Sequence, residues 1–171
     1  MKLAASLACL AAASLLAAAA ARADGAGDPA PVTSTNGEYF DKDGNPTYKI
    51  GKDGMVDWYT FIGYRMYGAN CLQCHGPDAL GSSYAPSLVD SLKSLTTQQV
   101  QGTIIGGKRN ISASQELVMP SFGENKNVMC YLDPIYVYLR ARSDGALNRE
   151  RPSNHEPKPA DWQKTVDGCF G

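Results

Sequence analysis

The sequence predicts a small all-α domain that carries a short β-hairpin at its N-terminal side. Apolar residues recur at helical spacing between residues 57 and 70, and polar caps introduce residues 96–105 and 133–142. Two Asp-Gly pairs, at residues 43–44 and 53–54, indicate tight turns on either side of a strand-like segment. A chain of 171 residues with this pattern suits one small domain.

The first 23 residues have the composition of a secretory signal peptide. Lys2 precedes an almost unbroken run of Ala and Leu, and Ala21-Arg22-Ala23 fits the small-x-small rule of signal peptidase. An uncleaved membrane anchor is the alternative, because the apolar run is long enough to span a bilayer. We expect cleavage after Ala23, export to the periplasm, and a soluble mature chain from Asp24 with no membrane partner.

The mature chain is weakly acidic. Loss of Lys2 and Arg22 with the signal peptide changes the formal net charge from −1 to −3. Nucleic-acid-binding domains are normally basic, so this balance argues against a nucleic-acid partner.

Residues 24–37 are mostly Gly, Pro, Ala, Ser, Thr and Asn, and they are predicted to form a flexible leader. The folded domain is predicted to cover residues 38–145. It begins with the hairpin, whose strand-like residues 47–50 lie between the two Asp-Gly turns.

Three helices are expected to follow the hairpin. Asp57 can cap the first helix, and Thr96 or Thr97 can cap the second, which Gly106-Gly107 would end. Asp133 followed by Pro134 predicts the start of the third. Residues 76–95 and 108–125 are predicted to be loops. Residues 146–171 are predicted to form a Pro-rich, charged tail packed on the domain.

The strongest signal is the motif Cys71-Leu72-Gln73-Cys74-His75, which follows the first predicted helix. The C-x-x-C-H pattern attaches one haem c covalently, because its spacing lets each thiol join one haem vinyl group and places the imidazole beneath the iron. A thioredoxin-like pair would need a preceding strand, and a zinc site would need further ligands. The sequence therefore predicts one covalent haem held by Cys71, Cys74 and His75.

The sixth iron ligand is predicted to be Met119, which lies in an irregular segment just before Pro120. A His/Met pair favours reduced iron and suits an electron carrier. The alternatives are Met55, Met66, Met129 and His155.

Pro86 is predicted to fix the orientation of His75. It offers a carbonyl oxygen to the second imidazole nitrogen and has no N–H of its own. The alternative is an ordinary turn proline.

Cys130 and Cys169 are the mature cysteines that remain once Cys71 and Cys74 are assigned to haem. Because an exported protein meets an oxidising environment, these two cysteines are predicted to form a disulfide. That bond would tie the tail to the start of the last predicted helix.

These motifs resemble those of class I cytochromes c. The spacing of Gly63 and Tyr67 before the haem motif is similar to that of the family, as are the proline and methionine loops at Pro86 and Met119. The resemblance covers residues 57–143. It implies the class I cytochrome c fold, in which the last helix crosses the first near Gly63 and Tyr67.

A closer resemblance extends over residues 38–145. It is to cytochromes that serve quinoprotein methanol dehydrogenases, and it is carried by residues 43–50, 56–60, 84–88, 118–122 and 127–133. Within that group the chain looks most like the XoxG type, the partner of lanthanide-dependent enzymes, rather than the larger cytochrome cL.

The closer resemblance implies a PQQ-dependent methanol or alcohol dehydrogenase as the electron donor. A second cytochrome c or an oxidase would be the acceptor. A general periplasmic carrier is the alternative function, and a haem enzyme would need an open iron position that Met119 closes. Docking is expected around the haem edge near residues 82–86, with orientation set by Lys108, Arg109 and residues 140–151.

Overall fold

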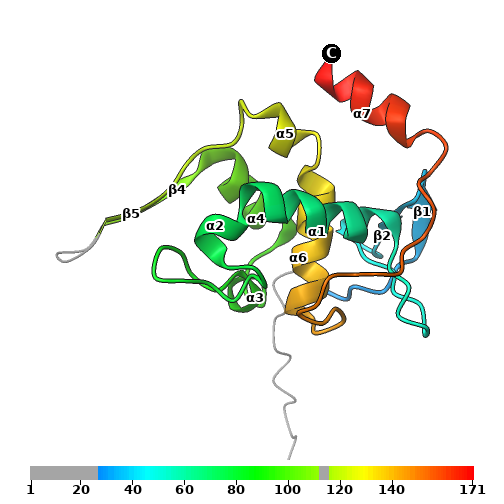
Figure 1. The fold of residues 1–171 in the computed structure, drawn as a ribbon, viewed down its shortest axis with the longest axis horizontal. Coiled ribbons are helices and arrows are strands. Elements are labelled where there is room, and N and C mark those ends of the chain that lie inside the picture. The colour runs from blue at the N-terminus through cyan, green and yellow to red at the C-terminus, as the bar shows by residue number, and fades with distance from the viewer. Residues whose placement is uncertain (1–26, 112–115) are drawn as a thin grey trace, which may run out of the picture.

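Two crossing helices organise the structure (Figure 1). The computed structural model describes residues 27–111 and 116–171, so the predicted signal peptide lies outside them. Helix α1 (Trp58–Asn70) lies across α6 (Leu132–Ser143), and this pair makes the most extensive contact between any two elements. Within the same residues, no helix has both the length and the apolar composition needed to cross a bilayer.

Gly63 lets the two helices approach closely. A Cβ atom built at Gly63 would collide with the Pro134 carbonyl group and would lie 2.9 Å from Cβ of Tyr138. Beside this point, the Tyr67 and Tyr138 rings lie 5.3 Å apart between centroids. The residues of α6 around the crossing are almost fully buried, which makes this helix the centre of the core.

Helix α1 begins as predicted, because Asp57 is its N-cap. One carboxylate oxygen of Asp57 accepts a hydrogen bond from the Thr60 amide at 2.8 Å. The other accepts from the Thr60 hydroxyl at 2.6 Å and from the Lys49 amide at 2.8 Å. The cap therefore also fixes the segment that leads from the N-terminal sheet into α1.

The N-terminal extension is a three-stranded antiparallel sheet of β1 (Thr33–Thr35), β2 (Glu38–Phe40) and β3 (Pro46–Thr47). The predicted Asp43-Gly44 turn connects β2 to β3. The second predicted turn is closed by a single bridge between Ile50 and Val56. Strand β1 lies within residues 24–37, so the flexible-leader prediction is wrong there. Asn36 and Gly37 turn β1 into β2 with φ of 49° and 79°.

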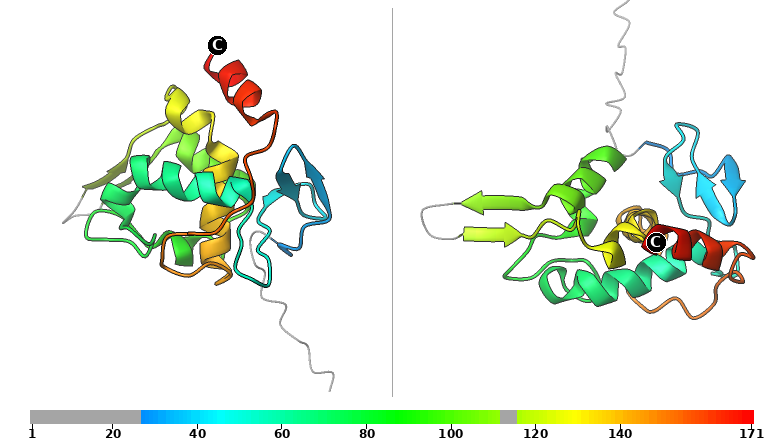
Figure 2. Two further views of the ribbon diagram at one scale, coloured as in Figure 1. Left: turned by 45° about the vertical axis from the view of Figure 1, so that its right-hand side comes forward. Right: turned by 90° about the horizontal axis from the view of Figure 1, so that it is seen from above.

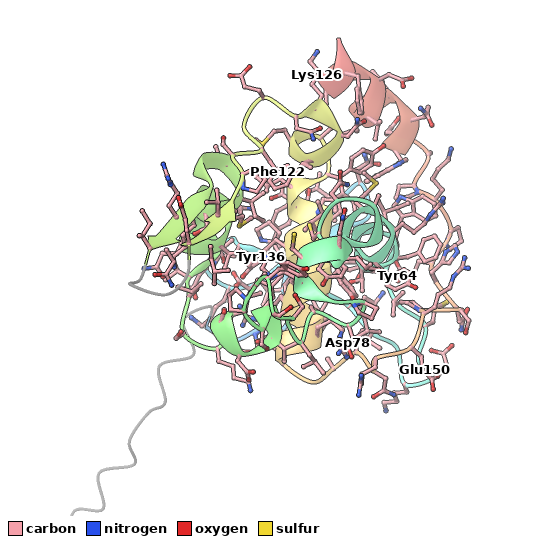
Figure 3. All side chains as sticks on the ribbon, turned by 60° about the vertical axis from the view of Figure 1, so that its left-hand side comes forward. Tyr64, Asp78, Phe122, Lys126, Tyr136 and Glu150 are labelled. Carbon is pink, nitrogen blue, oxygen red and sulfur yellow. A yellow bond between two sulfur atoms is a disulfide. The ribbon has the colours of Figure 1, made fainter. Side chains whose placement is uncertain are left out.

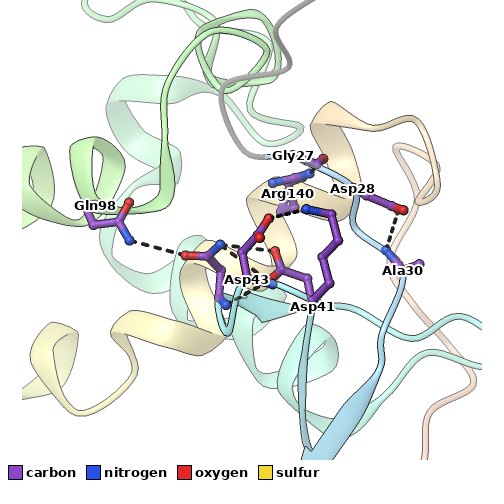
Figure 4. A network of polar contacts seen from close by, with 9 residues as sticks. Gly27, Asp28, Ala30, Asp41, Asp43, Gln98 and Arg140 are labelled. Carbon is purple, nitrogen blue, oxygen red and sulfur yellow. Dashed lines mark hydrogen bonds and ion pairs between the residues drawn. The ribbon is translucent and has the colours of Figure 1, made fainter.

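A polar network anchors this sheet to the helices (Figure 4). The Asp41 carboxylate accepts from the amides of Asp43 and Asn45, each at 2.9 Å, and so holds the turn. Gln98 donates to the Asn45 side chain at 3.3 Å. Arg140 of α6 donates to the Gly27 carbonyl oxygen at 2.5 Å and pairs with Asp144 at 2.8 Å.

The region after α1 has more regular structure than predicted. Short helices α2 (Leu72–His75) and α3 (Leu88–Ser91) precede α4 (Thr97–Gly106), whose predicted Thr96 cap forms a capping box with Gln99. Residues 108–125 are not simply a loop, because β4 (Lys108–Ile111) pairs with β5 (Glu116–Met119). This hairpin projects away from the N-terminal sheet (Figure 2).

The C-terminal part differs from the prediction in two places. After α5 (Lys126–Met129), helix α6 starts at Leu132 with Tyr131 as N-cap, so Asp133 and Pro134 lie inside its first turn. Proline is tolerated there because first-turn amides lack helical acceptors. The tail ends in α7 (Trp162–Phe170), which was not predicted.

The tail lies against the start of α1. His155 forms a bridge with Val56, and its ring stacks on Phe61 with centroids 3.8 Å apart. Trp162 is buried with its ring centroid 5.0 Å from that of Tyr59. Cys130 and Cys169 form a disulfide that joins the end of α5 to α7.

Substitution of Gly63 by Ala should be strongly destabilising. The added methyl group collides with helix backbone that cannot rotate away, so we expect a loss of about 3 kcal/mol or more in unfolding free energy. Gly68→Ala is the matched control within α1, since a Cβ atom there meets nothing within 4 Å. The unfolding free energy of that control should be unchanged or higher by up to about 1 kcal/mol. Equal stability of both variants in denaturant titrations would contradict the close crossing.

Glu38 should make stability fall as pH rises. Burial, and secondarily the charge of Asp133, raises the pKa of Glu38 from 4.5 to about 7, against a lowering effect of the hydrogen bond from Tyr59. Between these values the unfolded state releases a proton that the folded state retains, so rising pH favours unfolding until the folded carboxyl ionises. The unfolding free energy of Glu38→Gln should therefore be about 1–2 kcal/mol higher than that of the wild type at pH 8, allowing for partial solvent access, and equal to it near pH 4. Urea titrations at both pH values measure this, and a pH-independent difference would contradict it.

Candidate haem-binding site

The C-x-x-C-H motif forms one helical turn that continues directly from α1. The Cys71 amide donates to the Tyr67 carbonyl at 2.8 Å, and the His75 amide donates to the Cys71 carbonyl at 3.0 Å. Residues three apart on a helix lie on one face, so Cys71 and Cys74 present their thiols to the same side. The α1–α6 crossing therefore determines where both thiols and the imidazole lie.

His75 is oriented by the carbonyl group of Pro86. Its Nδ1 lies 3.0 Å from the Pro86 oxygen, and the residue is only 7% exposed. Because a carbonyl oxygen can only accept, Nδ1 carries the proton and Nε2 keeps a free lone pair. This is the tautomer that binds a metal through Nε2.

The loop that carries Pro86 is held tightly against the motif. The Gly81 amide donates to the His75 carbonyl at 2.9 Å, and Gly81 adopts φ of 87°. A Cβ atom at Gly81 would lie 2.6 Å from the Ser87 nitrogen and 2.8 Å from the Pro86 carbonyl carbon. A residue without a side chain is needed here for the loop to turn back onto His75.

Buried polar groups anchor the start of this loop. The Tyr67 hydroxyl donates to the Gly76 carbonyl at 2.5 Å. Arg142 of α6, which is 7% exposed, donates to the Asp78 carbonyl at 3.0 Å. The Asp78 carboxylate pairs with Arg149 of the tail. The sequence does not predict this network, because Arg142 and Arg149 are far from Asp78 in the chain.

The two thiols are suited to covalent attachment. Both are free, with Cys71 partly buried and Cys74 exposed. Burial, and to a lesser degree the neighbouring Cys74, raises the pKa of Cys71 to about 11. A redox-active pair would instead depress the pKa of one thiol. Across the described residues, no three His, Cys, Asp or Glu side chains converge as a metal site.

Met119 ends strand β5, and its position is fixed by α4. It packs against the hydrophobic core and pairs across the hairpin with Lys108. The next residues return to the end of α4, where the Ser121 hydroxyl donates to the Ile105 carbonyl at 2.6 Å and the Phe122 amide donates to the Ile104 carbonyl at 3.1 Å.

Two alternative ligands lie at the wrong end of α1. Met55 precedes that helix, and His155 stacks on Phe61 near its start. Ten residues of helix separate Phe61 from Cys71, which is about 15 Å at 1.5 Å per residue. Met66 and Met129 lie within α1 and α5. Met119 therefore remains the predicted sixth ligand.

Comparison with known proteins agrees with this arrangement. The family model described as cytochrome c oxidase, cbb3-type, subunit III matches residues 62–139. Cytochrome c-553I of Paracoccus denitrificans is 44% identical over 143 residues, which are 84% of this chain and 63% of that protein. This chain thus spans less than two thirds of that relative. Cytochrome c-555 of Methylococcus capsulatus is 33% identical over 105 residues, 61% of this chain and 76% of that protein.

The fold, the motif and these relatives define an electron-transfer protein with covalent haem c, and the chain belongs to the c-type cytochromes. The crystal structure of the c-type cytochrome XoxG from Methylobacterium extorquens AM1 is 49% identical. The match covers 82% of this chain and 86% of that one, with a TM-score of 0.76. The predicted class I cytochrome c fold is confirmed, with the small N-terminal sheet added to it.

The residues present fit the haem group, since two free thiols share one face and a correctly protonated imidazole follows them. Cys71 and Cys74 would form the thioether bonds, and His75 would ligate the iron. When bound, the haem supplies an iron that takes up and releases one electron.

Replacement of Met119 by Ala should remove the sixth ligand. We expect the oxidised variant to lose the sulfur-to-iron charge-transfer band and to bind added imidazole readily. Met129→Ala is the matched control, and its spectrum should be unchanged. Survival of the band in Met119→Ala with its loss in Met129→Ala would overturn the assignment.

Proposed function

We propose that this protein is a periplasmic mono-haem carrier that accepts single electrons from a PQQ-dependent methanol or alcohol dehydrogenase. The observation that carries the proposal is the 49% identity to the cytochrome XoxG over 82% of the chain. The resemblance noted in the sequence extends through residues 43–50, which in the structure form the β2–β3 turn and β3. These residues lie outside the haem site, so their similarity reflects more than the shared cofactor.

The site supports single-electron exchange at the surface. His75 and the Pro86 loop are held rigidly, while Leu72 and Cys74 of the same motif are exposed. A haem attached through Cys74 would be held beside solvent, where a donor could approach without any opening of the fold. A rigid ligand set also favours transfer because little structure must reorganise when the charge on iron changes.

Electrons would then pass to a second cytochrome c and on to a terminal oxidase. The alternative is a general periplasmic carrier that serves other reductases or oxidases. The matching family model supports that alternative, because its description names an oxidase subunit. The two candidates share the haem chemistry and differ in the donor.

Stopped-flow reduction distinguishes these functions. Oxidised cytochrome is mixed with substrate-reduced quinoprotein methanol dehydrogenase from the same organism, and the appearance of reduced haem is followed. We expect reduction at least as fast as dehydrogenase turnover, with two cytochromes reduced per alcohol oxidised to aldehyde. Reduction by ascorbate checks that the cytochrome is competent.

A haem that stays oxidised over many dehydrogenase turnovers, while another cytochrome of the organism is reduced, would favour the general carrier instead. The ascorbate control ensures that this result reflects the donor and not a damaged site.

A further inference from the structure

A groove of about 430 Å³ lies directly beside the haem-attachment motif. Its lining includes two arginines, Arg65 and Arg151, two tyrosines, Tyr64 and Tyr67, and Leu72 of the motif itself. Four segments form it: the last turns of α1, the start of α2, the loop after the motif at Pro77, and the tail near residue 151.

The tail side of this groove is fixed in place. Arg149 pairs with the buried Asp78 carboxylate, and Pro152 is buried on the other side of Arg151. In Figure 3, Tyr64, Asp78 and Glu150 lie on the same part of the molecule. Arg151 is thus positioned by residues before and after it and does not depend on a free chain end.

The two groove arginines differ from other exposed arginines of the chain. Arg109 pairs with Glu116, and Arg149 pairs with Asp78. Neither Arg65 nor Arg151 has an ion pair within residues 27–111 and 116–171, and the Tyr64 hydroxyl has no hydrogen bond to that part of the chain. Glu150 lies next to Arg151 in the chain but does not line the groove.

Two of the expected docking residues, Arg140 and Arg142, need correction because they are buried. Arg140 and Arg142 are 2% and 7% exposed and bind groups of the protein itself. Arg109 pairs with Glu116 but stays exposed. Within residues 140–151, an exposed guanidinium free of an ion pair with described residues is found only at Arg151.

We propose that this groove receives a carboxylate side chain of the protein that delivers electrons to the haem. Two guanidinium groups and a tyrosine hydroxyl supply donors that a carboxylate satisfies, and arginine is well suited to this through paired hydrogen bonds. Leu72 belongs to the haem-attachment motif, so an acidic residue bound here holds the donor beside the turn that carries the haem. The inference rests on the proposed function for the identity of that donor.

Local charge, and not net charge, must provide this recognition. The predicted mature chain is acidic overall, so a donor with an acidic surface gains no long-range attraction from it. Two uncompensated positive charges in one groove attract a carboxylate over about one Debye length, roughly 8–10 Å at ordinary salt. They therefore orient the encounter.

The test is charge reversal in the holo-protein. Arg65→Glu/Arg151→Glu is compared with the wild type in stopped-flow reduction by substrate-reduced quinoprotein methanol dehydrogenase. We expect the bimolecular rate constant of the variant to be about tenfold or more below that of the wild type at low ionic strength. The difference between the two rate constants should shrink as the salt concentration rises. Reduction by a neutral small-molecule reductant such as hydroquinone, and the reduction potential, should stay nearly unchanged.

Lys164→Glu is a matched control, because Lys164 is exposed on α7, which packs on the start of α1, away from the motif. Two such reversals, Lys164→Glu/Lys158→Glu, change the net charge equally and should alter the rate less than about twofold.

If the wild type is reduced and the groove variant matches its charge control, the groove proposal fails and the proposed function stands. If the wild type is not reduced by the dehydrogenase, the proposed function fails and the groove proposal fails with it. A groove variant slowed equally toward the neutral reductant would show an effect on the haem itself and would also overturn docking.

Discussion

The approach of α1 to α6 at Gly63 is the constraint on which the rest of the structure depends. A glycine there brings the α1 backbone against Pro134 and Tyr138 of α6. Since the haem motif is the next helical turn after α1, this contact sets the positions of Cys71, Cys74 and His75. The same α6 provides Arg142, which holds the loop that leads to Pro86. One helix crossing thus fixes the thiols, the imidazole and the loop that orients it.

The remaining elements make this arrangement rigid. The tail covers the start of α1 through His155 and Trp162, and the disulfide fastens its far end to α5. At the other end of α1, the tail pairs Arg149 with Asp78 and leaves Arg151 at the groove. The tail therefore stabilises the fold along most of its length and also places Arg151 beside the haem motif, where it can contact a partner.

Sequence patterns predicted what depends on local chemistry. The sequence predicts the Asp57 cap, a Thr cap at residue 96 or 97 and the class I fold, because caps and the haem motif depend on residues that are close together in the chain. The sequence patterns do not indicate the β4–β5 hairpin, whose strands have four residues each, or α7. Helix α7 is joined to the end of α5 by a disulfide between residues 39 apart in the chain. The burial of Arg140 and Arg142 was missed for a related reason: their partners, Gly27 and Asp78, are far away in the chain.

The central claim is that Cys71 and Cys74 hold the haem while Cys130 and Cys169 form the disulfide that stabilises the fold. Intact-mass analysis of the purified, denatured and unreduced protein, with thiol alkylation, tests this directly. The account predicts one haem that survives acid-acetone extraction, no alkylated cysteine, and a peptide joining Cys130 to Cys169 after digestion. Haem released by extraction, or alkylation at Cys71 and Cys74, would contradict it.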